Sequence, residues 1–240
     1  MEAVQFTNYQ KVVEFHSVFG LPVNTEYQTE LFTEDQKSVQ LRYDLIDEEY
    51  KELLEAYDNE DIVEVIDALS DSMYVVYGGA ATFGIDFDNV FRLNHTIPTG
   101  NINLDMFNSE DINDELHSYK YELEIMKNAI EDKDIYKIEQ CFVDFITTIY
   151  EIGNLFNINL DKSFDMVHRS NMSKTCCSEE EANQTVEWYK NEYDKNKMPY
   201  DTPKWRLSDD GNYYIIYNES TGKILKNINY QAVDLNDFTN

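Results

Sequence analysis

Apolar residues recur every three or four positions along most of this chain, a spacing that is typical of amphipathic helices. Between residues 37 and 57 the recurring positions are Val39, Leu41, Leu45, Ile46, Leu53 and Leu54. The pattern predicts helices over 7–20, 37–57, 60–83, 111–131 and 134–156. The end of the chain differs, because "YYIIYNESTGKILKNI" at 213–228 predicts a β-hairpin that turns at Gly222. We therefore expect an all-α fold with a small C-terminal β-hairpin.

An internal repeat relates two of these helical segments at a constant separation of 73 residues. Between residues 61 and 95, nine positions carry the same residue as the position 73 further on, where average composition gives about two or three. The identities run without a gap, from Asp61 with Asp134 to His95 with His168. We interpret this as the tandem duplication of one helical hairpin. The alternative is coincidence between two amphipathic helix pairs.

Acidic residues dominate the charge of the chain. Its 47 Asp and Glu residues outnumber 19 Lys and Arg, which gives a formal net charge of −28. This excess argues against binding to nucleic-acid phosphates or to anionic membranes, since both require positive charge on the protein. A cation binder and a mimic of DNA stay open. Hydrophobic residues make up 42% of the chain, so it is not a disordered acidic tail.

The cysteines indicate a reducing compartment. The chain has three, Cys141, Cys176 and Cys177, an odd number that includes an adjacent pair. Such a set makes a poor disulfide framework and lacks a second spaced pair of metal ligands, so free thiols are expected. No apolar run approaches the roughly 20 residues of a membrane-spanning helix, and the first ten residues do not read as a secretory signal. We expect a cytoplasmic protein.

Two neighbouring helices carry acids within their apolar pattern. The acids share one face of each helix: Glu48, Glu49 and Glu52 on the first, and Glu64, Asp67 and Asp71 on the second. If the helices pack antiparallel, the two stripes face each other and repel unless a cation lies between them. Oxygen ligands alone favour a hard divalent ion, above all Mg²⁺. The alternative is a pair of solvated faces. Against it, the second copy keeps only two of these acids, as Glu122 and Asp144.

The acidic segments resemble a known family. "EEYKE" and "EVIDALSD", followed later by "VHRSNMSK", are similar to the Glu-Glu-x-x-Glu…Glu-x-x-Asp signature of the MazG-like all-α nucleotide pyrophosphohydrolases, in the phosphoribosyl-ATP pyrophosphohydrolase-like branch. The resemblance covers residues 12–174. It implies that a nucleoside triphosphate is cleaved between its α- and β-phosphates with Mg²⁺, or with Mn²⁺ in its place. It also implies dimers or tetramers of four-helix units.

The resemblance assigns roles to matching positions of this chain. It implies a catalytic group of Glu48, Glu49 and Glu52, in which Glu48 orients or deprotonates the attacking water. The implied metal ligands are Glu49, Glu52, Glu64 and Asp67, and Asp71 is kept beside Asp67 because the motif aligns with either.

The family pattern is divided between the two copies of the repeat. The first copy holds the acids and ends in "LNHTIPTG", whereas the second has lost most of the acids and ends in "VHRSNMSK". This division predicts a pseudo-dimer of two fused four-helix-type repeats with a single site. Its domains are residues 1–105, 106–184 and a C-terminal extension at 185–240. The expected substrate-binding residues are Arg42, His168, Asn171 and Lys174: Asn171 reads the base and the two cations neutralise phosphates. For His168 the alternative is a structural role.

The sequence thus predicts a Mg²⁺-dependent nucleoside triphosphate pyrophosphohydrolase that serves nucleotide-pool housekeeping and that can form a homodimer. Phosphoribosyl-ATP is the alternative substrate. An ATP-driven motor is not expected, because the chain has no G-x-x-x-x-G-K-[ST] loop. A second class of function stays open, that of a non-catalytic acidic helical binding module or pseudoenzyme.

Overall fold

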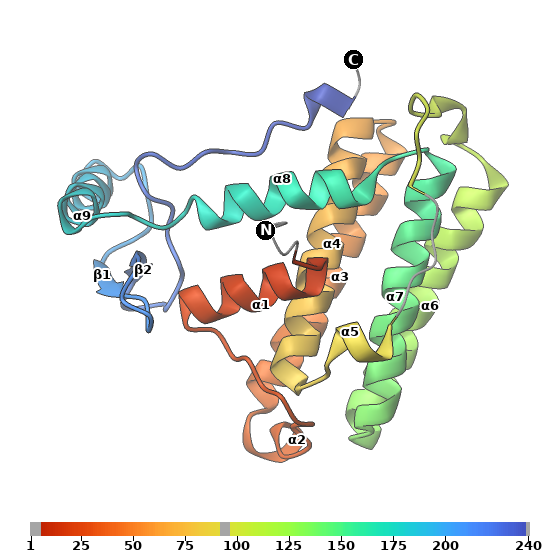
Figure 1. The fold of residues 1–240 in the computed structure, drawn as a ribbon, viewed down its shortest axis with the longest axis horizontal. Helices are drawn as coiled ribbons and strands as arrows, with labels where there is room; N and C mark the ends of the chain where they lie inside the picture. The colour runs from red at the N-terminus through yellow and green to blue at the C-terminus, as the bar shows by residue number, and fades with distance from the viewer. Residues whose placement is uncertain (1–5, 92–96, 239–240) are drawn as a thin grey trace, which may run out of the picture. The chain divides into compact units, whose positions relative to one another are not determined.

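The structure is a computed structural model that describes residues 6–91 and 97–238, so His95 of the repeat lies outside the described residues. The predicted all-α fold with a small C-terminal hairpin is confirmed (Figure 1). The helices are α1 (Asn8–Phe19), α2 (Leu31–Glu34), α3 (Gln36–Asp58), α4 (Ile62–Phe83), α5 (Phe87–Val90), α6 (Glu110–Asp132), α7 (Ile135–Leu155), α8 (Leu160–Met172) and α9 (Glu179–Asp194). The strands are β1 (Pro203–Leu207) and β2 (Tyr214–Asn218), and 3₁₀ turns lie at Leu104–Met106 and Asn236–Phe238.

The chain forms two compact units, each assembled from separate stretches of sequence. The first comprises Met1–Val13, Val23–Val167 and Asp234–Asn240, and the second comprises Glu14–Pro22 and His168–Val233. Both halves of the proposed duplication, up to residue 167, therefore lie in the first unit. The domain boundaries expected from the sequence, at residues 105 and 184, separate the two repeats and the C-terminal extension. These boundaries stay a prediction.

Short connections fold the long helices of the first unit into two hairpins. Three residues separate α3 from α4 and two separate α6 from α7, so each pair is antiparallel. Asp61 caps α4 by accepting hydrogen bonds from the next backbone N–H groups, and Asp134 caps α7 in the same way. The hairpins pack through α3 against α6 and through α4 against α7. The result is a four-helix bundle (Figure 1).

The backbone of the bundle follows the 73-residue separation. Glu60 and Lys133, which precede the two caps, have φ angles of 55° and 57°. Gly84 and Asn157, which follow the second helix of each hairpin, have φ angles of 72° and 60°. These left-handed turns let both hairpins stop and turn in the same way. The correspondence accords with a duplication, which itself stays a prediction.

Large apolar side chains fill the bundle. Those that are fully buried include Ile46, Leu53, Ile66, Leu69, Phe83, Phe142, Phe145 and Phe156. At the contact between α4 and α7 the packing is close, because a Cβ atom added to Gly79 would lie 2.7 Å from Cζ of Phe142. Glycine at this position therefore allows the two hairpins to approach each other.

Gly79→Ala is expected to lower the free energy of unfolding by about 1–3 kcal/mol, because the added methyl group overpacks the contact with Phe142. Urea unfolding followed by circular dichroism measures the effect. The matched background is Phe142→Leu, which makes room, so the cost of Gly79→Ala should shrink there. An equal cost in both backgrounds would show that the contact is not responsible.

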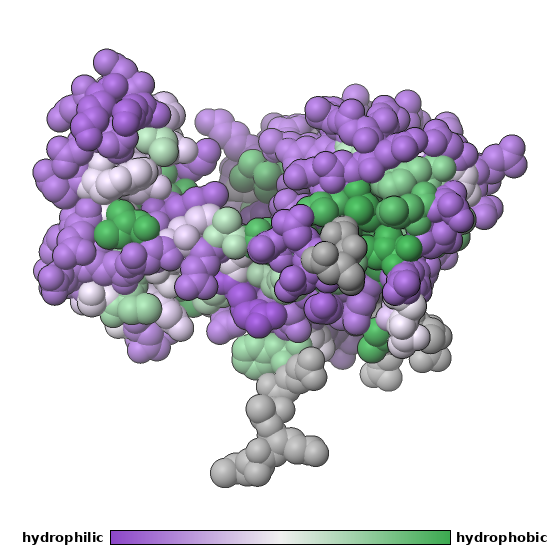
Figure 2. Space-filling model, turned by 90° about the horizontal axis from the view of Figure 1, so that it is seen from above, coloured by the Kyte–Doolittle hydropathy of each residue, from purple (hydrophilic) through white to green (hydrophobic). Residues whose placement is uncertain are grey.

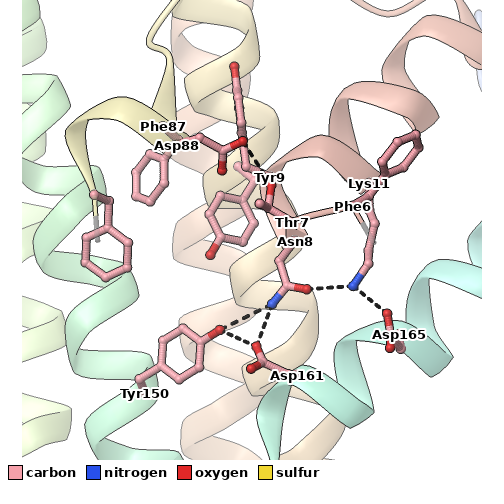
Figure 3. A pocket seen from close by; sticks show the side chains of 12 residues that line it. Phe6, Thr7, Asn8, Tyr9, Lys11, Phe87, Asp88, Tyr150, Asp161 and Asp165 are labelled. Atoms are coloured by element: carbon pink, nitrogen blue, oxygen red, sulfur yellow. Dashed lines mark hydrogen bonds and ion pairs between the residues drawn. The ribbon is translucent and has the colours of Figure 1, made fainter. Parts of the chain in front are cut away.

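A pocket of about 320 Å³ lies in the first unit, beside the start of α1 (Figure 3). Its polar side chains bond to one another. Nδ2 of Asn8 donates to Oδ1 of Asp161 at 2.8 Å, and the hydroxyl of Tyr150 donates to the same oxygen at 2.6 Å. Lys11 forms an ion pair with Asp165. We therefore interpret this network as the anchor of α1 on α7 and α8 rather than as a ligand site.

The hairpin belongs to the second unit. β1 and β2 pair antiparallel across a turn at residues 208–213. Asp210 closes that turn by accepting hydrogen bonds from two of its residues. The predicted turn at Gly222 is also present, because Tyr217 and Ile224 form an antiparallel bridge, and the backbone N–H groups of Asn218 and Leu225 donate to the carbonyls of Lys223 and Ile216, each at 2.8 Å. The predicted pairing is therefore confirmed, and β1 is an additional partner of β2 that was not predicted.

All three cysteines are free, as expected from the sequence. Cys141 and Cys176 are buried, and Cys177 is exposed. Among the described residues, no helix combines the length and the apolar character that crossing a membrane requires. Hydrophilic residues cover most of the face shown in Figure 2, in keeping with the high net charge.

Candidate metal site between two helices

The six predicted acids lie on α3 and α4, the two helices of the first hairpin. Their exposure falls into two groups: Glu49, Asp67 and Asp71 are half-buried, whereas Glu48, Glu52 and Glu64 are exposed. The apolar neighbours on each helix explain this difference, since Leu53 and Ile66 are fully buried beside them. The acids therefore form the edge of the bundle core rather than a freely solvated surface.

The acids of the two helices affect one another's protonation. Burial first, and then the charges of Asp71, Glu52, Glu48 and Asp67, together raise the pKa of Glu49 to about 8. The pKa of Asp67 is raised by burial first and then by Glu64 and Glu52. Carboxylates from both helices thus act on one another. Whether they converge on one cation, and the individual roles of the residues, stay predictions.

The acids supply the oxygen donors that a divalent cation prefers, and Glu49 has no positively charged partner of its own among the described residues. Oε2 of Glu49 is buried and has no hydrogen-bond donor among the described residues. No lysine or arginine is among the groups that shift the pKa of Glu49. In the part of the chain that the structure describes, no three His, Cys, Asp or Glu side chains already form a compact metal-binding group.

The equivalent region of the second hairpin has a different chemistry. Glu122 and Asp144 stand where the first hairpin has Glu49 and Asp71, and burial and Asp144 raise the pKa of Glu122. Nε2 of Gln140, which replaces Asp67, donates to Oδ1 of Asp144 at 2.8 Å. An amide therefore satisfies this carboxylate. The set of facing acids is complete only in the first hairpin.

Arg42 lies on α3, two turns before Glu49. The side chain is buried at 8% exposure, and its Nε atom has no hydrogen-bond partner in the described residues. Burial lowers the pKa of Arg42 to about 10, and no carboxylate opposes this shift. A buried guanidinium without an acidic partner is an unusual and costly feature. It leaves a positive charge within the first unit that an anion can neutralise.

The remaining predicted residues belong to the second unit. Nε2 of His168 lies 3.2 Å from a carboxylate oxygen of Glu14. Nζ of Lys174 donates to Oδ1 of Asn171 at 2.6 Å and lies 5.9 Å from the ring centre of Phe15. These contacts lie within the second unit, which contains residues 168–174 of the "VHRSNMSK" segment. Whether the three side chains bind substrate stays a prediction.

Spacing along the chain did not single out two buried hydroxyl groups on α4 and α6. Ser72 follows Asp71 on α4, and Tyr119 lies on α6, in the other hairpin. Both are fully buried, and neither hydroxyl has a hydrogen-bond partner in the described residues. Ser72 is next to a predicted ligand, which was an available signal. Nothing in the sequence placed Tyr119 beside the first hairpin.

Comparison with known proteins identifies a family. The family described as Phosphoribosyl-ATP pyrophosphohydrolase matches residues 12–96, which include α3, α4 and all six acids. A relative, "Uncharacterized protein L479" of Acanthamoeba polyphaga mimivirus, is 35% identical over 242 residues, which cover 97% of this chain and 95% of the relative. No solved structure matches the chain. The family matched is one of pyrophosphohydrolases, which act on nucleotide-like substrates.

Proposed function

We propose that this chain, which belongs to the MazG-like all-α nucleotide pyrophosphohydrolase superfamily, is a Mg²⁺-dependent enzyme. Its reaction is the cleavage of a nucleoside or deoxynucleoside triphosphate to the monophosphate and pyrophosphate. One observation carries the proposal: Glu49 is half-buried and faces acids of both α3 and α4 without a compensating cation. Phosphoribosyl-ATP is the alternative substrate, since it contains the same phosphoric anhydride bond.

The acids of the first hairpin would hold the metal. We assign Glu49, Glu52, Glu64 and Asp67 as ligands, and Asp71 as a further ligand because it contributes most, after burial, to the raised pKa of Glu49. A divalent ion bound there supplies positive charge for the phosphate oxygens and makes water a better nucleophile. The net charge of −28 would otherwise oppose the approach of a triphosphate.

The remaining roles follow from exposure and charge. Glu48 is exposed next to the half-buried Glu49, so it stays available to accept a proton from the attacking water. Arg42 carries a buried charge without a carboxylate partner in the described residues, so we assign it to a phosphate group. Gln140 and Asp144 satisfy each other in the second hairpin, which favours one metal site per chain.

The experiment that tests this function is a substrate panel with pyrophosphate detection. It contains the eight common ribo- and deoxyribonucleoside triphosphates together with phosphoribosyl-ATP, each assayed with Mg²⁺, with Mn²⁺ and with EDTA. We expect at least one compound to yield pyrophosphate with metal and none to do so with EDTA. A folded protein that cleaves no compound would favour the non-catalytic binding module.

Arg42→Met is expected to raise KM for the triphosphate about 10- to 100-fold, because a hydrogen bond to a charged group contributes about 1.5–3 kcal/mol. The free energy of unfolding should not fall, since the variant replaces an uncompensated buried charge with an apolar side chain. Steady-state kinetics and urea unfolding measure the two effects. Lys120→Met, at an exposed position of α6, controls for the loss of one positive charge. An unchanged KM would remove Arg42 from the substrate site.

A further inference from the structure

Three buried oxygen atoms without hydrogen-bond partners come from three helices of the first unit. They are Oε2 of Glu49 on α3, Oγ of Ser72 on α4 and the hydroxyl oxygen of Tyr119 on α6. Ser72 and Tyr119 are both 0% exposed. Leaving a buried polar group unpaired costs about 1–3 kcal/mol, so an arrangement that leaves three unpaired requires an explanation.

The three groups belong to helices that pack on one another, since α3 contacts both α4 and α6. Burial raises the pKa of the Tyr119 hydroxyl, the Ser72 hydroxyl opposes this rise, and the charge of Glu49 adds to it. Neither hydroxyl has a hydrogen-bond partner among the described residues. The ring of Tyr119 is held on two sides, since it stacks on Tyr50 at 5.1 Å and packs against Phe145 at 5.0 Å between ring centres. Because Tyr50 directly follows Glu49 on α3, these contacts fix the ring of Tyr119 against the same turn of that helix.

These hydroxyls are present on one side of the bundle only. At the separation of 73 residues, Tyr119 corresponds to Ile46 and Ser72 corresponds to Phe145, both fully buried and apolar. Glu122, the counterpart of Glu49, also has a buried oxygen without a donor in the described residues. The donors thus occur beside the carboxylate that belongs to the complete set of acids and are missing beside the one that does not.

We propose that Tyr119, assisted by Ser72, is a positioning residue for Glu49. In this arrangement the hydroxyl of Tyr119 donates a hydrogen bond to Oε2 of Glu49. The other carboxylate oxygen of Glu49 is then directed at the cation. Hydrogen bonds of this kind hold ligating carboxylates in metal sites and affect metal affinity. The inference rests on the proposed metal site, and it extends that site to α6. The second hairpin, which has lost most of its own acids, then supports the acids of the first.

The test is calorimetric titration of the nucleotide-free protein with Mn²⁺. Tyr119→Phe is expected to weaken Mn²⁺ binding about 10-fold, within the range of about 10- to 100-fold typical of outer-shell partners. Its thermal midpoint in EDTA should stay unchanged or rise, because the variant removes an unpaired hydroxyl. Tyr50→Phe is the matched control, since its hydroxyl donates to the backbone carbonyl of Leu116 at 3.2 Å, and its Mn²⁺ affinity should equal that of the wild type.

Ser72→Ala gives a second, independent measurement, with a smaller loss of Mn²⁺ affinity expected. Wild-type affinity in both Tyr119→Phe and Ser72→Ala would overturn the inference, as would an equal loss in Tyr50→Phe. The positioning role of Tyr119 and the proposed enzymatic activity can fail separately. If the wild type binds Mn²⁺ and Tyr119→Phe binds it more weakly, the positioning role holds. If the same wild-type protein cleaves no nucleotide, the proposed activity is refuted.

Discussion

Glu52→Gln should lower the rate of pyrophosphate release more than about 100-fold. Removing an outer-shell partner of a metal ligand costs about 10- to 100-fold in activity, and removing a ligand itself should cost more. Glu52 is exposed, and its charge contributes to the raised pKa of both Glu49 and Asp67. It therefore lies between the acids of the two helices. The amide of Gln keeps the size of the side chain and removes the charge that attracts the metal. Steady-state rates at saturating Mg²⁺ measure the loss.

Glu55→Gln is the matched control for this experiment. Glu55 is exposed on α3, one turn after Glu52, and it is not among the groups that shift the pKa of Glu49. The control should keep wild-type activity, and both variants should unfold at the wild-type urea concentration. Full activity in a folded Glu52→Gln protein would exclude the proposed metal assignment.

The second large effect concerns stability in the absence of metal. Glu49→Gln is expected to raise the free energy of unfolding in EDTA at pH 8 by about 2 kcal/mol, since one pKa unit corresponds to about 1.4 kcal/mol and the group is partly screened by solvent. The folded pKa of Glu49, about 8, lies above the ordinary value of 4.5. The carboxyl group therefore carries no penalty below pH 4.5, and the penalty grows as the pH rises toward 8.

Urea unfolding at pH 5 and pH 8 measures this gain, which should be much larger at pH 8. Glu122→Gln is the control, because Glu122 occupies the equivalent position and also has a buried oxygen without a donor in the described residues. Both variants should stabilise the metal-free protein. Only Glu49→Gln should lose the stabilisation that Mg²⁺ gives the wild type. An equal response to Mg²⁺ in all three proteins would contradict the placement of the site.

Local signals explain why the long helices could be predicted. Asp61 and Asp134 mark the starts of α4 and α7, and the apolar spacing after each continues to the end of the helix. The C-terminal strands could be predicted only in part. The run at 213–218 and its partner after Gly222 follow from the local pattern. β1 could not be predicted in this way, because its turn at 208–213 is closed by side-chain hydrogen bonds to Asp210, which depend on geometry rather than on pattern.

Contacts between distant parts of the chain were outside the reach of pattern analysis. The second unit joins residues 14–22 to 168–233, and within it Arg206 donates to the backbone carbonyl of Phe19 at 2.7 Å. Tyr119 stacks on Tyr50, the residue after Glu49, for the same reason, because α6 packs on α3 only in the folded bundle. The facing acids were predictable, since their spacing and a short helical hairpin are sufficient to bring them together.

The central claim is that the acids between α3 and α4 direct the cleavage of a nucleotide to its monophosphate and pyrophosphate. The most direct test is product analysis by ³¹P NMR on the best compound of the substrate panel, with wild-type protein and with Glu52→Gln. The account predicts that the wild type forms monophosphate and pyrophosphate in equal amounts with Mg²⁺, that EDTA stops the reaction, and that Glu52→Gln forms neither product at a comparable rate. Release of inorganic phosphate and a nucleoside diphosphate, or equal rates in the two proteins, would contradict it.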